Sequence, residues 1–179
     1  MRIESIVVGN LETNCYLLFD DKNKEVIIVD PGDEADKILS KVEGYKIIAI
    51  LVTHTHDDHI GTIPTITNSI KCPIYDKYNL EEGLFKINNY EFDVIYTPGH
   101  KEDQIVFYFK KDKCMFVGDF IFEGSIGRMD LPGGDPMKMI NSIKKILTYD
   151  KDIILYPGHG DKTTLKNEEK ALEYYVSII

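Results

Sequence analysis

The chain has 179 residues, a formal net charge of −9 at pH 7 and 43% hydrophobic residues. This length suits one domain of about 100–200 residues that buries its core without disulfides, so we expect a single domain over residues 1–179. The 30 acidic residues against 21 basic ones argue against nucleic acid or an anionic membrane as a main partner, because phosphate binding needs a basic face. A small-molecule substrate is the expected partner.

The first residues and the cysteines bear on where the protein works. Residues 1–10 alternate between polar and apolar side chains, which is typical of a strand and unlike a signal peptide. No stretch is long and apolar enough to predict a membrane span. Cys15, Cys72 and Cys114 are far apart and form no CxxC pair, so we expect no disulfide framework and a cytoplasmic location. The sequence specifies no oligomeric state.

The first part of the chain is predicted to be rich in strands. Alternating or short β-branched apolar runs predict four of them: Arg2–Val8, Cys15–Phe19, Glu25–Val29 and Lys46–Val52. A helix is predicted over Glu34–Val42, where apolar side chains share one face. A second helical segment is expected over Ile60–Asn68, interrupted by Pro64.

The second part mixes strands with the two longest predicted helices. Its strands and loops are expected over Pro73–Tyr96, Ile105–Phe109, Met115–Val117, Glu123–Gly134 (a glycine-rich loop) and Ile153–Tyr156. Asp135 can cap a helix whose apolar stripe runs to Leu147. Thr164 or Asn167 can start a last helix that runs to about Val176. Groups of strands with helices between them predict the α+β class, as sheets with helices packed outside.

All five histidines lie in settings typical of metal ligands. Three occur in the segment THTHDDH, Thr53–His59, and the other two follow Pro-Gly, as His100 and His159. Asp119 follows an apolar strand through Gly118. Each of these groups comes just after a predicted strand. Ligands past strand ends can converge at one edge of a sheet, where rigid elements hold functional loops.

The spacing within the histidine-rich segment separates two kinds of metal site. His54 and His56 are two residues apart, so they share a face only if the segment is extended, and both can then reach one metal. Asp58 and His59 turn away from that pair and are available to a second metal. Imidazole and carboxylate groups without a nearby thiolate suit zinc or iron. A dinuclear site also needs a bridging carboxylate, for which Asp119 is the candidate.

The motif HTHDDH, with the later His100, Asp119 and His159, resembles the metallo-β-lactamase fold superfamily along nearly the whole chain. The resemblance implies an αβ/βα sandwich of two mixed β-sheets flanked by helices. It also implies a ligand set: His54, His56 and His100 for the first metal, Asp58, His59 and His159 for the second, and Asp119 bridging both. Asp30, in Val-Asp-Pro-Gly, matches the superfamily's early Asp, which orients the ligands through hydrogen bonds.

Within this superfamily the chain resembles the glyoxalase II-like group, which hydrolyses thioesters of glutathione-type thiols. The resemblance rests on the segments Thr13–Tyr16 (TNCY) and Gly124–Asp135 (GSIGRMDLPGGD). Two departures stand out. The chain ends at Ile179, so the helical C-terminal domain of glyoxalase II is not expected, and thiol specificity does not carry over. Lys101 stands where the group has a small hydroxyl residue, so we expect a charged rim.

The expected activity is hydrolysis of a thioester, such as hydroxyacylglutathione, by a hydroxide that bridges two divalent metals. Zinc is the expected metal and iron(II) the alternative. Asp58 is expected to bind metal and to orient the hydroxide. Arg128 and Lys101 are the candidates for binding a substrate anion. The competing interpretations are an ion pair of Arg128 with Asp130 and a solvated surface charge for Lys101.

Two other activities fit the same residues. An oxidoreductase like the persulfide dioxygenases would hold one iron through two histidines and a carboxylate, for example His54, His100 and Asp119. A phosphodiesterase or RNA-processing enzyme shares the histidine-rich motif, but the acidic composition argues against it. Ligands for two metals are present, which favours the hydrolase.

Overall fold

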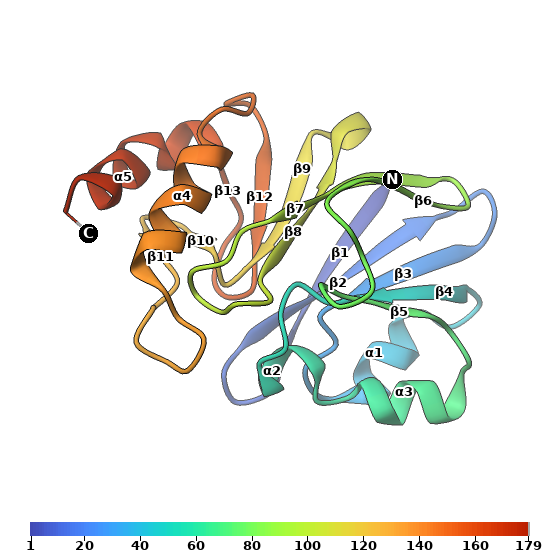
Figure 1. Cartoon of the computed structure of the whole chain (residues 1–179). Coiled ribbons are helices and arrows are strands. Elements are labelled where there is room, and N and C mark those ends of the chain that lie inside the picture. Colours follow the sequence, from blue (N-terminus) through green and yellow to red (C-terminus); the bar gives the residue numbers. More distant parts are fainter. Residues whose placement is uncertain (179) are drawn as a thin grey trace.

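Two β-sheets pack face to face and carry helices on their outer faces (Figure 1). The computed structural model describes residues 1–178. The first sheet has the order β1-β2-β3-β4-β5: β1 (Arg2–Val8), β2 (Thr13–Asp20), β3 (Glu25–Val29), β4 (Lys46–Leu51) and β5 (Ile74–Tyr75). The second has the order β13-β12-β9-β8-β7-β6: β6 (Gly83–Ile87), β7 (Tyr90–Tyr96), β8 (Ile105–Phe109), β9 (Cys114–Gly118), β12 (Ile154–Pro157) and β13 (Thr163–Thr164). A separate hairpin joins β10 (Ile121–Phe122) and β11 (Ser125–Ile126).

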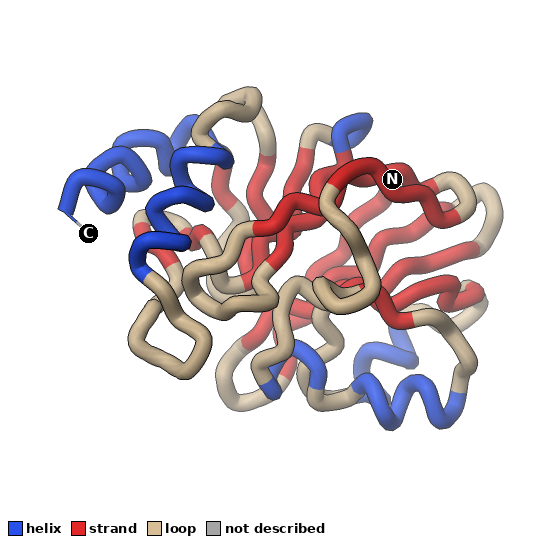
Figure 2. The backbone as a smooth tube through the Cα atoms, viewed as in Figure 1, coloured by secondary structure: helices blue, strands red, loops and turns tan. Residues whose placement is uncertain are grey.

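The helices lie outside the two sheets, as the blue segments around the red strands of Figure 2 show. They are α1 (Ala35–Lys41), α2 (Asp57–Ile60), α3 (Ile63–Ser69), α4 (Pro136–Ile146) and α5 (Leu165–Ile178), with a single 3₁₀ turn, η1 (Lys110–Asp112), between β8 and β9. Both sheets are mixed: β3, β4 and β5 run parallel in the first, and β9 and β12 run parallel in the second. The predicted fold class, two mixed sheets flanked by helices, is confirmed. Among the described residues, no helix has the length and apolar character needed to cross a membrane.

Three buried clusters hold these layers together. The cluster between the sheets is largely aromatic, with Phe92, Phe107 and Phe116 fully or almost fully buried. The second cluster lies between the first sheet and helices α1 and α3, and the third lies between the second sheet and helices α4 and α5. Burial of a large apolar side chain contributes about 1.5–3 kcal/mol, so these clusters supply most of the stabilisation.

Strand β2 lies between two of these clusters and has apolar side chains on both faces. Cys15 and Leu17 contact the helix side of the sheet, and Tyr16 and Leu18 contact the aromatic cluster between the sheets. A strand covered on both faces reads as a continuous apolar run, because neither face meets water. This is why Cys15 is a buried free thiol rather than a reactive one.

Three local predictions need comment. Pro64 does not interrupt a helix but lies in the first turn of α3, where its missing N–H is not needed. The segment expected to be a loop over Glu123–Gly134 contains the short strand β11, which pairs with β10. Asp135 accepts a hydrogen bond from the Lys138 backbone N–H at 3.0 Å and caps α4 as predicted.

The sheets bring several strand ends to one edge of the molecule. The parallel strands β3 and β4 end at the same edge of the first sheet. In the second sheet β7 and β9 are each antiparallel to β8, and β12 is parallel to β9, so these three strands also end together. The residues that follow the five strands include every histidine of the chain and Asp119.

Candidate metal centre

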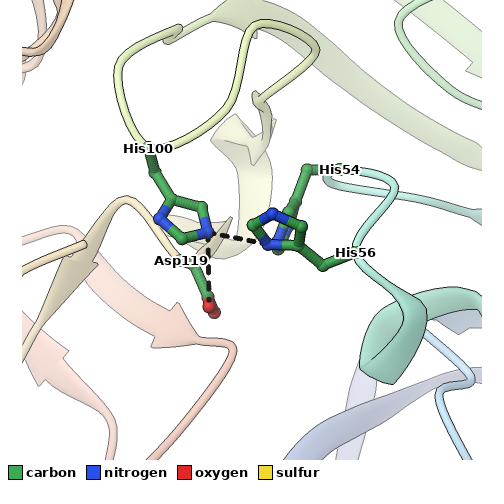
Figure 3. A group of neighbouring side chains, drawn as sticks. All are labelled: His54, His56, His100 and Asp119. Carbon is green, nitrogen blue, oxygen red and sulfur yellow. Dashed lines mark hydrogen bonds and ion pairs between the residues drawn. The ribbon is translucent and has the colours of Figure 1, made fainter. Parts of the chain in front are cut away.

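The ligand candidates lie on short loops directly after these strand ends. His54 follows β4, and the chain stays extended through His56, whose ψ is 146°, before α2 begins at Asp57. His100 follows β7, and His159 follows β12. Rigid strands therefore fix the positions of side chains that are far apart in the sequence. Figure 3 shows His54, His56 and His100 turned toward one another, with Asp119 below them.

Three imidazole nitrogens form the first cluster. His56 Nδ1 lies 3.0 Å from His54 Nε2 and 3.0 Å from His100 Nε2. His54 and His100 are almost completely buried, whereas His56 is partly exposed. The rings of His54 and His56 lie on one side of the non-helical segment that joins β4 to α2, as residues two apart do in an extended chain.

A second cluster joins one carboxylate with two further imidazoles. Asp58 Oδ2 lies 3.2 Å from His159 Nε2 and 3.5 Å from His59 Nε2. Asp58 and His59 lie in the short helix α2, which turns them away from His54 and His56. The fold therefore places Asp58 and His59 in a different group of side chains from His54 and His56.

Asp119 lies between the two clusters. Its Oδ2 is 3.7 Å from His100 Nε2 and 3.5 Å from His159 Nε2, and its Oδ1 is 3.3 Å from His59 Nε2. The side chain is 12% exposed, so its charge has little help from water. One carboxylate therefore faces nitrogens of both groups, which is the geometry expected of a bridging ligand.

The spacing and the hydrogen bonding of these atoms both fit divalent cations. Nitrogen ligands of a tetrahedral zinc ion at 2.0–2.1 Å lie about 3.3 Å apart, close to the separations above. His59 Nε2 and Asp119 Oδ1 are buried and have no hydrogen-bond partner within the described residues. Buried polar atoms without partners cost about 1–3 kcal/mol each, and a cation between them removes that cost. The cluster of histidines and aspartates thus fits a dinuclear metal site.

In three histidines whose Nε2 faces the cluster, the other ring nitrogen, Nδ1, is hydrogen-bonded to the protein. His59 Nδ1 donates to Asp30 Oδ2 at 3.0 Å, and His100 Nδ1 donates to the Arg128 carbonyl at 2.8 Å. His159 Nδ1 donates to the Leu11 carbonyl at 3.0 Å. A proton on Nδ1 leaves the Nε2 lone pair free, so these contacts select the tautomer that binds metal.

Asp30 contacts one histidine of the second cluster directly and one of the first cluster through Thr53. It is 1% exposed, and in addition to His59 it accepts hydrogen bonds from the Thr53 N–H at 2.8 Å and the Thr53 hydroxyl at 2.7 Å. Thr53 Oγ1 in turn lies 3.2 Å from His54 Nδ1. One buried carboxylate thus orients His59 directly and His54 through Thr53.

Sequence analysis assigned no role to three threonines at the site, although Thr13 belongs to the TNCY segment quoted for the resemblance. Thr53 links Asp30 to His54, and Thr13 donates from its hydroxyl to Asp58 Oδ2 at 2.8 Å. Thr55 is held by a carboxylate from another loop. Thr53 and Thr55 alternate with the histidines of the HTHDDH motif, which is the only sequence signal that could have pointed to them.

Burial keeps two of the histidines in their neutral, metal-binding form. The pKa of His54 lies well below its usual value because the ring is buried and His59 is close by. Burial and the neighbouring His100 also lower the pKa of His56. Neutral imidazole is the form that binds metal, so both residues are ready to ligate at neutral pH.

At the second cluster, neighbouring carboxylates raise the pKa of the histidines instead of lowering it. Hydrogen bonds that the His159 ring donates to the carboxylates of Asp119 and Asp58 raise the pKa of His159 to about 10. At His59 burial favours the neutral ring, but Asp119 and Asp30 outweigh it and raise the pKa to about 10. Negative charge at this place attracts a proton when no metal is bound, and the same charge would attract a divalent cation.

A glycine lets the Thr53 contact form. Gly118, the last residue of β9, has φ +50°, a conformation that few other residues adopt without strain. A Cβ at this position would collide with the Thr53 hydroxyl. The glycine before Asp119 therefore allows two loops to approach closely enough to complete the site.

The two candidates for substrate binding have different surroundings. The Arg128 guanidinium forms two 2.7 Å contacts with Asp130 on the surface, as in the competing interpretation, and the residue meets the site through its carbonyl. Lys101 is not a solvated charge: its side chain is only 17% exposed and donates to the Thr55 hydroxyl. Tyr156 packs against Phe116, with ring centroids 5.1 Å apart.

Comparison with known proteins places this arrangement in a family. The model of the metallo-beta-lactamase superfamily matches residues 8–86 and 81–159, which together include every candidate ligand. The chain belongs to the metallo-beta-lactamase superfamily. This superfamily consists largely of metal-dependent hydrolases, in agreement with the dinuclear geometry.

Individual members of the superfamily resemble the chain over almost its full length. The hydroxyacylglutathione hydrolase GloC of Haemophilus influenzae is 31% identical, with 96% of each chain aligned. The crystal structure of the BLEG-1 B3 metallo-beta-lactamase superposes with a TM-score of 0.91 at 30% identity, covering 97% of this chain and 99% of that one. TTHA1623 in a di-iron-bound form superposes with a TM-score of 0.84 at 30% identity, covering 94% and 98%.

Proposed function

We propose that this protein is a dinuclear metal-dependent hydrolase of thioesters, of the S-acyl-thiol type exemplified by hydroxyacylglutathione. The observation that carries the proposal is the position of Asp119 between two complete groups of ligand candidates. His54, His56 and His100 would hold the first cation. Asp58, His59 and His159 would hold the second, with Asp119 binding both.

Two divalent cations, zinc in our proposal, would supply a water that is deprotonated near neutral pH and a Lewis acid for the thioester carbonyl oxygen. The residues of the chain hold and orient the reactants. Asp58 lies at the open side of the site, and its side chain is 22% exposed. Burial raises the pKa of this carboxyl, but His159 and His59 bring it down to about 2, so the group is ionised at neutral pH. It can therefore accept a hydrogen bond from the attacking water and fix its direction.

The leaving group requires little help from the protein. A thiolate is a much better leaving group than an alkoxide, because thiols have a pKa of about 8.5. No strong general acid is needed near the sulfur. This agrees with the contacts of the carboxylates at the site: Asp58 accepts from Thr13, Asp30 accepts from Thr53, and Asp119 faces His159.

The relatives support the reaction class. The Haemophilus influenzae protein that is 31% identical is named a hydroxyacylglutathione hydrolase. TTHA1623, 30% identical, has a di-iron-bound form, so iron is the alternative to zinc. A persulfide dioxygenase with one iron is the competing activity, but it would leave the group of Asp58, His59 and His159 without a role.

A panel of thioesters tests the proposal. The metal-loaded protein is expected to release thiol from small thioesters, measured with a thiol-reactive dye. Asp119→Asn removes a charged ligand worth several kcal/mol to the reaction, so the rate should fall at least about 100-fold. Asp152→Asn, an exposed aspartate, is the matched control and should leave the rate unchanged. Oxygen uptake with a persulfide, in the absence of thioester hydrolysis, would favour the dioxygenase instead.

A further inference from the structure

Lys101 is a largely buried cation near the candidate metal centre. It follows His100 directly, and its ammonium donates to the hydroxyl of Thr55, which lies between His54 and His56. The ammonium therefore lies beside two ligand-bearing loops at once. Its side chain is 17% exposed, whereas most lysines extend freely into water.

A buried carboxylate keeps this lysine in place. Asp103 is 1% exposed at its side chain, and its Oδ2 accepts hydrogen bonds from Thr55 N at 3.2 Å and Thr55 Oγ1 at 2.5 Å. Its Oδ1 has no hydrogen-bond partner among the described residues and lies 3.9 Å from Lys101 Nζ. The ammonium is attracted by this oxygen and held by Thr55, so little rotamer freedom is left to lose when a ligand binds.

The ammonium has hydrogen-bonding capacity that the protein does not use. An ammonium has three N–H donors, and only the one to Thr55 makes a hydrogen bond within the described residues. The 3.9 Å separation from Asp103 is too long for a hydrogen bond. At least one donor is therefore available to a ligand anion at the rim of the site.

We propose that Lys101 binds a carboxylate of the thioester substrate and so selects anionic over neutral thioesters. Thr55 and Asp103 act as positioning residues that hold the ammonium beside the metal centre. The proposal rests on the proposed function and adds a substrate class to it. Carboxylate is the group we commit to, and it can lie on the thiol side or on the acyl side of the thioester.

Matched thioesters separate these two sources of the carboxylate. On the thiol side, the acetyl thioester of thioglycolate is compared with that of thioglycolamide, its neutral isostere. On the acyl side, the 4-carboxybenzoyl thioester of thioglycolamide is compared with the benzoyl one. Lys101→Met should raise KM about tenfold for the anionic thioester of one pair, which corresponds to about 1.4 kcal/mol. It should leave kcat for that thioester unchanged, and both constants for the neutral thioester. Lys101→Arg should restore most of the preference.

A lysine elsewhere on the surface is the matched control. Lys22 is exposed and lies in the turn between β2 and β3, away from the loops that carry the ligand candidates. Lys22→Met removes the same charge, so it should leave both KM values unchanged if the effect is local. An equal effect of Lys101→Met on the charged and neutral members of both pairs would overturn the proposal.

A binding measurement keeps this test independent of hydrolysis. Thioglycolate and thioglycolamide are titrated into the cobalt(II)-loaded protein, and the sulfur-to-cobalt absorption gives each Kd. The 4-carboxybenzoate and benzoate ions are then used as competitors of thioglycolamide. The natural protein should bind the charged member of one pair about tenfold more tightly, and Lys101→Met should lose that preference. If the protein binds no thiol, or binds the charged and neutral members of both pairs equally well, the proposal for Lys101 is overturned. If it prefers the charged member but hydrolyses no thioester, only the proposed hydrolase activity is overturned.

Discussion

Replacing Asp30 by asparagine tests how the site is prepared for metal. Asparagine has the same shape and tolerates the positive φ of 52° at this position better than most residues. Its carbonyl oxygen can still accept from the Thr53 N–H. Its amide group would then face His59 Nδ1 as a donor, where Asp30 accepts a hydrogen bond at 3.0 Å. His59 would have to carry its proton on Nε2, the atom that faces Asp119 and Asp58.

The expected loss is largest for the second metal. Removing an outer hydrogen-bond partner of a ligating histidine typically weakens metal binding by about 10–100-fold. His54 keeps Thr53 as its hydrogen-bond acceptor, so the first metal should be affected less. The metal-free protein should also lose about 1–3 kcal/mol of stability, because buried donors lose a charged acceptor.

The affinities of the two sites for metal are measured by titrating metal into the initially metal-free protein in the presence of a competing chelator. Urea unfolding of the metal-free protein measures its stability. Asp36→Asn, on the exposed face of α1, is the matched control and should change neither quantity. If Asp30→Asn bound the second metal as tightly as the natural protein, the role assigned to the Asp30–His59 contact would be wrong.

Three further predictions concern stability. Asp135→Ala should lower the free energy of unfolding by about 1 kcal/mol in urea, through loss of the α4 cap; no change would mean that the cap is unimportant. Gly118→Ala should destabilise the protein and lower metal content, because a Cβ collides with Thr53; a fully stable, metal-binding variant would refute this. Without metal, the contribution of His59 and His159 is present below pH about 6.5 and is lost as pH rises toward about 10, so the melting temperature should fall over that window. Saturating zinc should abolish this decline, and a metal-free melting temperature that is flat to pH 10 would contradict it.

The strands and the ligand candidates could be predicted because local signals encode them. Short β-branched runs mark buried strands such as β3 and β4, and polar residues directly after them mark the edge of a sheet. The spacing of two between His54 and His56 fixes a shared face without knowledge of the rest of the chain.

The contacts behind the ligands could not be predicted, because they join segments far apart in the sequence. Asp103 holds Thr55 across 48 residues, and Thr13 reaches Asp58 across 45. Threonine in a loop has no periodicity that marks it as a partner of a ligand. Lys101 was a plausible surface charge for the same reason: its burial depends on where the loop of Thr55 lies.

Metal content tests directly whether this chain holds two cations through Asp119 for hydrolysis. The protein is purified without chelator or added metal, and its metals are identified and counted. We expect about two zinc ions per chain, weaker binding or loss of both in Asp119→Asn, and thiol release from thioesters by the natural protein. About one iron per chain, with oxygen uptake on a persulfide and no thioester hydrolysis, would contradict it.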